Sequence, residues 1–318
     1  MDSRDVQAGR LEPAGKPLVR VWLQRLAALT ALLVAAGVTV AIVLRTQRRP
    51  SKARSAAASQ HSHAPATTST TTQTTGSPGT ASVPILAYHV INVPPATSSA
   101  SPDLYVPADE FAAQISALKA AGWHAVTLDQ LQAYRTRGVV LGTGKPIVIT
   151  FDRGYASQYT NALPVLKRAG WVGVENLQVS GLTPADGGLT DSQIRGLIAA
   201  GWELDTQGVS QSDLTILSPS QLQLEVAGAR QTLSSRYKIP VNWFSYPSGD
   251  YDANVISAVQ SAGFTGATTT IPGWAGTKSD RFRLPRLQVA GGTSPSQLMS
   301  QITAAQQSTS APPSFHGP

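Results

Sequence analysis

Residues 146–155 read Pro-Ile-Val-Ile-Thr-Phe-Asp-Arg-Gly-Tyr, an apolar run that ends in an acidic residue, a basic residue and a glycine. Ile147–Phe151 has the length and the β-branched composition of a buried strand, and Asp152 and Arg153 stand at its carboxyl end. Strands that are apolar throughout belong to parallel sheets covered by helices. This stretch therefore predicts an α/β fold with polar residues at the carboxyl edge of its sheet.

Short strands of this kind alternate with helical stretches from Val83 onward. The candidate strands are Pro84–His89, His124–Thr127, Ile147–Phe151, Gly173–Val179, Trp202–Thr206, Trp243–Tyr246, Thr265–Thr270 and Phe282–Leu287. The candidate helices are Pro107–Ala121, Asp129–Thr136, Tyr159–Ala169, Asp191–Ala200, Pro219–Tyr237, Ala253–Ala262 and Pro295–Ala304. This alternation predicts a closed or nearly closed (β/α) barrel over residues 83–304, with its site at the carboxyl ends of the strands.

Four joints share an Ala-Gly-aromatic pattern, which supports one repeated β/α unit. They are Ala121-Gly122-Trp123, Ala169-Gly170-Trp171, Ala200-Gly201-Trp202 and Ala262-Gly263-Phe264. Glycine just past a helix adopts the left-handed conformation that ends it. We expect the three tryptophans to be core residues, and Thr127, Thr190 and Ser218 to be N-caps.

The segments before the barrel are typical of a membrane tether. Residues 1–25 form a short basic tail, and residues 26–44 are an uncharged run bounded by Arg25 and Arg45. As a helix this run spans about 28 Å, close to the hydrocarbon core of a bilayer. A cleaved signal peptide is the alternative, but its apolar region would be shorter. We therefore expect an uncleaved transmembrane helix.

Residues 45–82 and 305–318 lack the composition of a packed core. The first segment is rich in Ser, Thr and Ala and predicts a flexible linker, and the second predicts a disordered tail. Basic residues nearly balance across the run 26–44, so they do not fix its orientation. The linker favours a single-pass protein of the cell membrane with an extracytoplasmic barrel.

Charge and cysteine content exclude several functions. Ten basic and three acidic residues precede residue 55, which accounts for the whole net charge of +7. The rest of the chain has no excess positive charge, so it does not favour nucleic-acid binding. The chain contains no cysteine, which excludes disulfides and thiolate metal sites.

Several ordered motifs resemble the polysaccharide deacetylases with a NodB homology domain (carbohydrate esterase family four). The likeness spans Val83 to about Ile302. Its pieces are Val83-Pro-Ile-Leu-Ala-Tyr-His-Val, Gly122-Trp-His-Ala-Val-Thr-Leu, Thr150-Phe-Asp-Arg-Gly154, Gly201-Trp-Glu-Leu, Phe244-Ser-Tyr-Pro-Ser-Gly249, Ala262-Gly-Phe-Thr-Gly-Ala267 and Leu284-Pro-Arg286. The resemblance implies a barrel that acts on N-acetylated glycans or cell-wall polysaccharides with a divalent metal such as zinc.

The chain departs from that family at the three expected metal ligands. The resemblance implies Thr-Phe-Asp-Asp-Gly at the end of the third strand, where the first Asp is the general base and the second a ligand. Asp152 keeps the base position, whereas Arg153 replaces the ligand. Gln207 and Gln211 occupy two further ligand positions, which are histidines in the family. Because Arg repels a cation and a carboxamide is a poor zinc ligand, we expect no metal cofactor.

The first functional hypothesis is a glycan-binding pseudoenzyme at the cell envelope. The alternative is an active carbohydrate deacetylase that uses Asp152 as base and His89 as acid without a metal. A structural envelope protein is a third possibility. His89 could equally be a packed strand-end residue, and Arg153 could form only a local ion pair.

The remaining candidates are residues that could line a sugar-binding groove. Aromatic rings can stack on sugars, and carboxamides and a guanidinium can bind sugar hydroxyl or acetamide groups. These residues are Tyr88, Arg153, Tyr155, Gln207, Gln211, Tyr246 and Trp274. Asp205 and Asp213 lie near the second motif and could rebuild a metal site with Asp152, which we consider the weaker interpretation.

Overall fold

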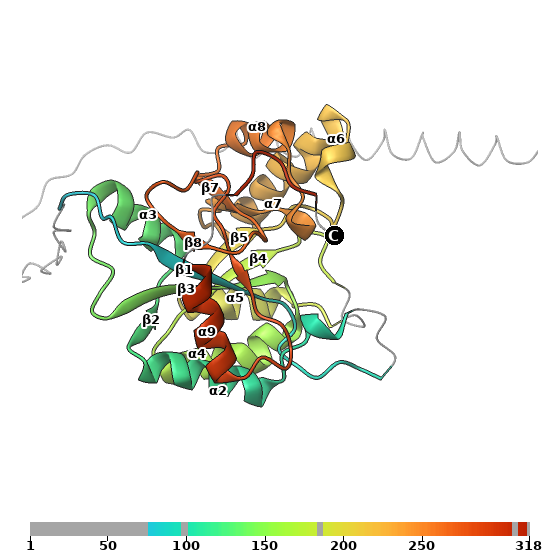
Figure 1. Cartoon of the computed structure of the whole chain (residues 1–318). Helices are drawn as coiled ribbons and strands as arrows, with labels where there is room; N and C mark the ends of the chain where they lie inside the picture. The colour runs from blue at the N-terminus through green and yellow to red at the C-terminus, as the bar shows by residue number, and fades with distance from the viewer. Residues whose placement is uncertain (1–75, 97–100, 183–186, 307–310, 317–318) are drawn as a thin grey trace, which may run out of the picture. The chain divides into compact units, whose positions relative to one another are not determined.

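The computed structural model describes residues 76–96, 101–182, 187–306 and 311–316 (Figure 1). The expected basic tail, transmembrane helix and most of the linker lie outside these ranges. Within them, no helix combines the length and the hydropathy needed to cross a bilayer.

Parallel strands alternate with helices along the chain, as the sequence predicts. The strands are β1 (Val83–Tyr88), β2 (Trp123–Ala125), β3 (Lys145–Arg153), β4 (Val174–Leu177), β5 (Glu203–Thr206), β6 (Trp243–Ser245), β7 (Gly266–Thr268), β8 (Trp274–Ala275) and β9 (Leu287–Gln288). The helices are α2 (Ala108–Ala120), α3 (Leu128–Arg137), α4 (Leu163–Ala169), α5 (Asp191–Ala199), α6 (Pro219–Gln223), α7 (Ala229–Tyr237), α8 (Ala253–Ser261) and α9 (Pro295–Ala305).

The strands form a curled sheet in the order β7-β6-β5-β4-β3-β1-β8, with β2 paired to β3 and β9 to β1. The short segment around β9 bridges the two edges of this half-barrel. Leu284 forms a bridge to Thr268 of β7, and Leu287 pairs with Leu86 of β1. The expected eighth strand, Phe282–Leu287, is thus mostly irregular chain that nevertheless closes the barrel.

Helix ends follow the local signals in the sequence. Thr127, Thr190 and Ser218 each accept a hydrogen bond from the backbone three residues later, and each belongs to a capping box. The four glycines of the Ala-Gly-aromatic joints all have φ between +75° and +86°. Both predictions are confirmed.

Two expected helices contain a wider π-helical turn. Gln158–Ala162 precedes α4, and Leu224–Gly228 joins α6 to α7. Pro164 explains the first, because proline has no N–H to donate into the regular helical pattern. The second π-helical turn, Leu224–Gly228, contains no proline.

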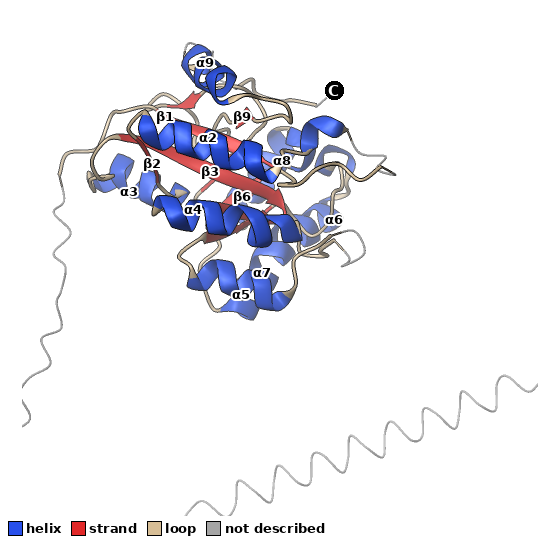
Figure 2. Ribbon diagram, turned by 90° about the horizontal axis from the view of Figure 1, so that it is seen from below, coloured by secondary structure: helices blue, strands red, loops and turns tan. Residues whose placement is uncertain are grey.

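The outer face of the sheet carries most of the apolar core. Helices α2 and α4 cover β1 and β3 on one side (Figure 2). Beneath them Tyr88, Phe111 and Phe151 pack at ring-centroid distances of 5.1–5.9 Å. Trp123, Trp171 and Trp202 are also buried, so their prediction as core residues is confirmed.

Residues 311–316 differ from the disordered tail that the sequence predicts. Phe315 exchanges two backbone hydrogen bonds with Tyr251, each 2.9 Å long. The Tyr251 hydroxyl donates to the Pro312 carbonyl, and Arg283 Nη1 donates to the same oxygen. This short segment therefore packs against the turn that follows β6.

The inner face of β5 begins with a cluster of carboxyl groups. The backbone N–H groups of Asn242 and Trp243 donate to Asp205 Oδ1, and Asp129 N–H donates to Glu203 Oε2. Burial and the nearby Asp129 carboxylate raise the pKa of Glu203 to about 7. Burial and Glu203 also raise the pKa of Asp205 well above its ordinary value.

Substituting Glu203→Gln should change how the free energy of unfolding depends on pH. A carboxyl whose pKa is raised on folding stabilises the protein at low pH, and this contribution is lost as the pH rises towards about 7. Glutamine keeps the acceptor for Asp129 but does not titrate. Between pH 5 and pH 8, the free energy of unfolding of the variant should rise by about 2 kcal/mol relative to that of the wild type. Chemical denaturation at pH 5 and pH 8 measures this difference, and Asp109→Asn, which removes an exposed carboxylate, is the control. The same change in the free energy of unfolding with pH in the variant and the wild type would contradict the prediction.

Candidate functional site

The carboxyl end of β3 holds a buried ion pair. Asp152 receives two parallel hydrogen bonds from Arg286, with Nη1 2.8 Å from Oδ1 and Nη2 2.9 Å from Oδ2. Both side chains are at most 2% exposed. Arg286 also donates from Nε to the Thr269 carbonyl and from Nη1 to the Thr150 hydroxyl. The pair therefore links β3 to the chain after β7 inside the barrel.

Asp152 is held in its charged form by these neighbours. Burial alone would raise the pKa of Asp152, but the Arg286 guanidinium and its hydrogen bonds bring that pKa below its ordinary value. Asn176, paired with Asp152 in the register of β4, adds a hydrogen bond of 2.8 Å from Nδ2 to Oδ1. A carboxylate with a low pKa is a weak general base.

His89 faces the same carboxylate from the end of β1. Its Nε2 lies 4.0 Å from Asp152 Oδ2, outside hydrogen-bond distance, and its side chain is 15% exposed. Burial lowers the pKa of His89, and the charges of Arg286 and Arg153 lower it further, although Asp152 acts in the opposite direction. The imidazole is therefore neutral at pH 7.

Arg153 has an unusual backbone and an incomplete set of partners. Its φ is +77°, a left-handed conformation that costs a residue with a side chain on the order of 1 kcal/mol. The guanidinium carbon lies 5.9 Å from the centre of the Tyr155 ring. The Nε atom is buried without a hydrogen-bond partner in the described residues. None of the ion pairs found there involves Arg153.

Gln207 and Gln211 follow β5 in different environments. Gln207 is 3% exposed, and its Oε1 has no partner among the described residues. Gln211 is exposed and donates from Nε2 to the Ser248 hydroxyl over 3.1 Å. The backbone of Ser248 is itself in the left-handed conformation, with φ +54°.

A row of buried polar atoms without partners runs across the strands at this end of the barrel. The atoms are Gln207 Oε1, Ser245 Oγ and Thr268 Oγ1. Ser245 and Thr268 are paired in the register of β6 and β7, and Thr206, the residue before Gln207, pairs with Phe244, the residue before Ser245. A buried polar group without a partner costs about 1–3 kcal/mol, so such a row indicates a place for water or a polar ligand.

The donor atoms at this end do not fit a divalent cation. The described residues contain no group of three or more His, Asp or Glu side chains that could hold a metal ion. Both oxygens of Asp152 are occupied by Arg286. Asp205 accepts two backbone hydrogen bonds, and Asp213 accepts from the Thr215 backbone and hydroxyl. The suggestion that Asp205 and Asp213 rebuild a metal site with Asp152 is therefore wrong.

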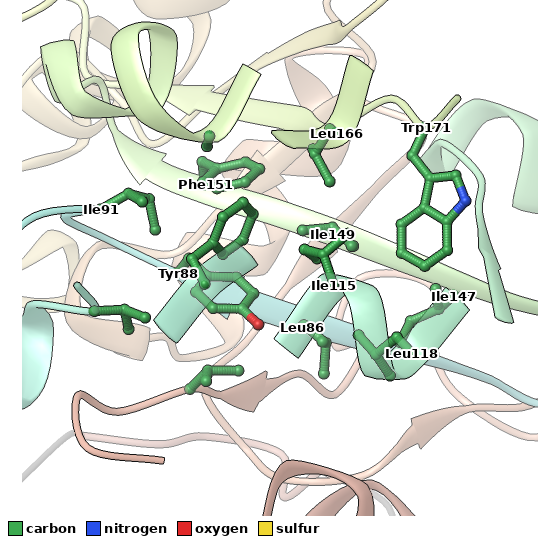
Figure 3. Close-up of a cluster of buried hydrophobic side chains, with 14 of the residues drawn as sticks. Leu86, Tyr88, Ile91, Ile115, Leu118, Ile147, Ile149, Phe151, Leu166 and Trp171 are labelled. Atoms are coloured by element: carbon green, nitrogen blue, oxygen red, sulfur yellow. The ribbon is translucent and has the colours of Figure 1, made fainter. Parts of the chain in front are cut away.

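Three of the aromatic residues proposed for a sugar groove are placed elsewhere. Tyr88 is fully buried under α2 (Figure 3), and its hydroxyl donates to Gln114 Oε1. Tyr246 is fully buried and donates to the Phe282 carbonyl. Trp274 pairs with Pro84 at the amino end of β1, at the opposite end of the strand from His89. Only Tyr155 of these aromatics lies beside Arg153, and it is half-buried.

The sequence analysis missed Arg286 and Asn176, the two side chains that hold Asp152. Arg286 carries a detectable signal, because it stands between the apolar residues Pro285 and Leu287 of an expected strand, and a buried arginine requires a partner. Asn176 could be found only from the register of β3 and β4. The unpartnered row of Gln207, Ser245 and Thr268 likewise depends on the register of three strands.

Comparison with known proteins agrees with this architecture. The chain is 28% identical over 222 residues to "Putative polysaccharide deacetylase YxkH" of Bacillus subtilis, covering 70% of this chain and 76% of that protein. The fold is similar to that of the deacetylase PplD of Streptococcus pyogenes, with a TM-score of 0.64 and 24% identity over 70% of this chain and 99% of that one. It is also similar to BC0361, a polysaccharide deacetylase from Bacillus cereus, with a TM-score of 0.62 and 24% identity over 70% and 69% of the two chains.

The residues at the base and metal-ligand positions lie within the part of the chain that the family model matches. The family model for polysaccharide deacetylase matches residues 142–267, which include Asp152, Arg153, Gln207 and Gln211. The match to the family model identifies residues 142–267 as a polysaccharide deacetylase domain, and the curled parallel sheet with Asp152 at the end of β3 agrees with the fold of the similar structures.

Proposed function

We propose that this family member binds an N-acetylated glycan or cell-wall polysaccharide and does not carry out metal-dependent deacetylation. The row of Gln207 Oε1, Ser245 Oγ and Thr268 Oγ1 carries this proposal. Sugars present many hydroxyl and amide groups, and these would satisfy one acceptor and two hydroxyls in a buried row. Binding in such a site gains from pairing atoms that are otherwise desolvated.

The loss of metal chemistry follows from the same site. A metal lowers the pKa of bound water from about 15.7 to about 7, which supplies hydroxide at neutral pH. Arg153 stands at a ligand position of the family and repels a cation, and Gln207 and Gln211 offer only carboxamides. Asp152, with its lowered pKa, is a weak base for water that no metal activates.

Hydrolysis by Asp152 and His89 without a metal is the second candidate function. The distance of 4.0 Å between His89 Nε2 and Asp152 Oδ2 favours it, because both groups face one space at the end of β1 and β3. Against it stands the lowered pKa of His89, which leaves little imidazolium to act as a general acid at pH 7. Glycan binding without turnover is therefore the better-supported function.

We also propose that residues 26–44 anchor the protein in the cell membrane as one helix and that the barrel lies outside the cytoplasm. The uncharged run and its basic flanks support this. The full chain should sediment with membranes and resist high-salt extraction, whereas residues 76–318 should stay in the supernatant. Protease added to intact cells should cleave the barrel, and protection of the barrel would contradict the proposed orientation.

The purified wild-type chain should release no acetate from chitooligosaccharides, with or without added zinc. The variant Arg153→Asp/Gln207→His/Gln211→His restores the three ligand types of the family. It should bind close to one zinc per chain by elemental analysis, where the wild type binds none above background. Zinc-dependent acetate release by the wild type would overturn the proposal. Zinc-independent release that is lost in Asp152→Asn would favour the second candidate.

Thr268→Val should strengthen the fold and weaken glycan binding. Valine has the shape of threonine without the unpartnered hydroxyl, so the free energy of unfolding should rise by about 1 kcal/mol. The matched control is Thr206→Val, because the Thr206 hydroxyl donates to the Leu177 carbonyl and its removal should destabilise the fold. Chemical denaturation and calorimetric titration with chitotetraose measure both effects. If Thr268→Val and the wild type bind chitotetraose equally well, the row of unpartnered polar atoms is not part of the glycan-binding site.

A further inference from the structure

We propose that the site prefers glycans with an anionic group, a carboxylate or a phosphate, and that Arg153 binds this group. The inference rests on the proposed glycan binding and names the class of glycan. It follows from the charges at the end of β3, from the buried Nε of Arg153, which has no hydrogen-bond partner among the described residues, and from the backbone conformation of Arg153.

Asp152, Arg286, His89 and Arg153 together carry a net charge of +1. Arg286 and Asp152 neutralise each other through two hydrogen bonds. His89 is neutral at pH 7 because burial lowers its pKa. Arg153 then remains as a cation without a salt-bridge partner in the described part of the chain. A half-buried guanidinium attracts an anion more strongly than one in bulk water, because the surroundings screen its charge less.

The guanidinium of Arg153 has the donor geometry to bind a planar anion. The Tyr155 ring, 5.9 Å from the guanidinium carbon, packs beside the side chain and limits its freedom. A guanidinium offers five N–H donors, and its fork matches the oxygen pairs of carboxylate and phosphate groups. The Nε atom is buried and lacks a partner, so the hydrogen bonding of this side chain is incomplete in the described residues.

The backbone at Arg153 is strained in a way that local structure does not explain. Among the described residues, Arg153, Lys238 and Ser248 are the non-glycine residues with positive φ. Lys238 ends α7 in the left-handed conformation common at helix ends. Arg153 instead is the last residue of β3, and Ser248 lies in the turn Pro247–Gly249 that follows β6. Strain of this kind is concentrated at binding sites, where it directs a side chain towards a ligand.

Calorimetric titration of the purified full chain would test the preference. The acidic probe is a tetrasaccharide of alternating N-acetylglucosamine and glucuronic acid, and chitotetraose is its neutral counterpart. A second pair, N-acetylglucosamine 6-phosphate and N-acetylglucosamine, separates phosphate from carboxylate recognition. We expect at least one acidic probe to bind about tenfold tighter than its neutral counterpart at low salt. This preference should shrink in 0.5 M salt.

Substitutions at position 153 identify the responsible group. Arg153→Gln should remove the preference for the acidic probe and leave binding of the neutral probe within about twofold. Arg153→Lys should retain part of the preference, because lysine keeps the charge without the fork. Arg168→Gln, which removes an exposed arginine of α4, is the matched control and should bind like the wild type.

A melting comparison separates a binding role from a structural one. Arg153→Gly should melt no lower than Arg153→Ala, because glycine adopts φ +77° without strain, and both should lose the acidic preference. Equal binding of acidic and neutral probes by the wild type, or an unchanged preference in Arg153→Gln, would overturn the inference. Binding of neither acidic nor neutral sugars would instead refute the proposed glycan binding itself.

Discussion

The pair of Asp152 and Arg286 is the interaction on which the interior of the barrel depends. It joins the end of β3 to the segment that bridges β7 and β1, and it does so with both side chains out of contact with water. Removing one member of a buried ion pair leaves the other charge unpaired, which costs several kcal/mol. Asn176, Thr150 and the Thr269 carbonyl complete the hydrogen bonds of the pair. The same arrangement fixes the charge of Asp152, so closure of the barrel and the electrostatics of the site cannot be separated.

The fold could be predicted because its signals are local. The glycines at 122, 170, 201 and 263 end helices through a conformation that other residues avoid, and capping residues such as Thr127 begin them. The two-residue strand β8 has no comparable signal, and it was missed. The closure of the barrel by a mostly irregular segment could not be predicted from the periodicity of the sequence either. It depends on hydrogen bonds between Leu284 and the end of β7, which are distant in sequence from β1.

The candidate site was predicted in part. Asp152, His89 and Arg153 come together because they end adjacent strands or follow one another, and the sequence shows both facts. The prediction of Tyr88 and Tyr246 as groove residues was wrong, because each lies one position away from the residues of its strand whose side chains point into the barrel. Tyr88 pairs with Phe151 and so shares its outward face, whereas Asp152 points inward. Proximity to a strand end therefore does not identify a groove residue unless its face of the sheet is also known.

The direction of β1 has a consequence for how this protein could work at a surface. The polypeptide enters the barrel at Val83, where Gly79 and Ala81 are held by Tyr134 of α3, and β1 then runs towards His89. The point of entry thus lies about 20 Å, at 3.3 Å per residue, from the far end of β1, which is beside the end of β3 that carries Arg153. Under the proposed membrane anchor, which precedes Val83, this far end would be free to face outward, and the proposed glycan would lie across it without passing the attachment point.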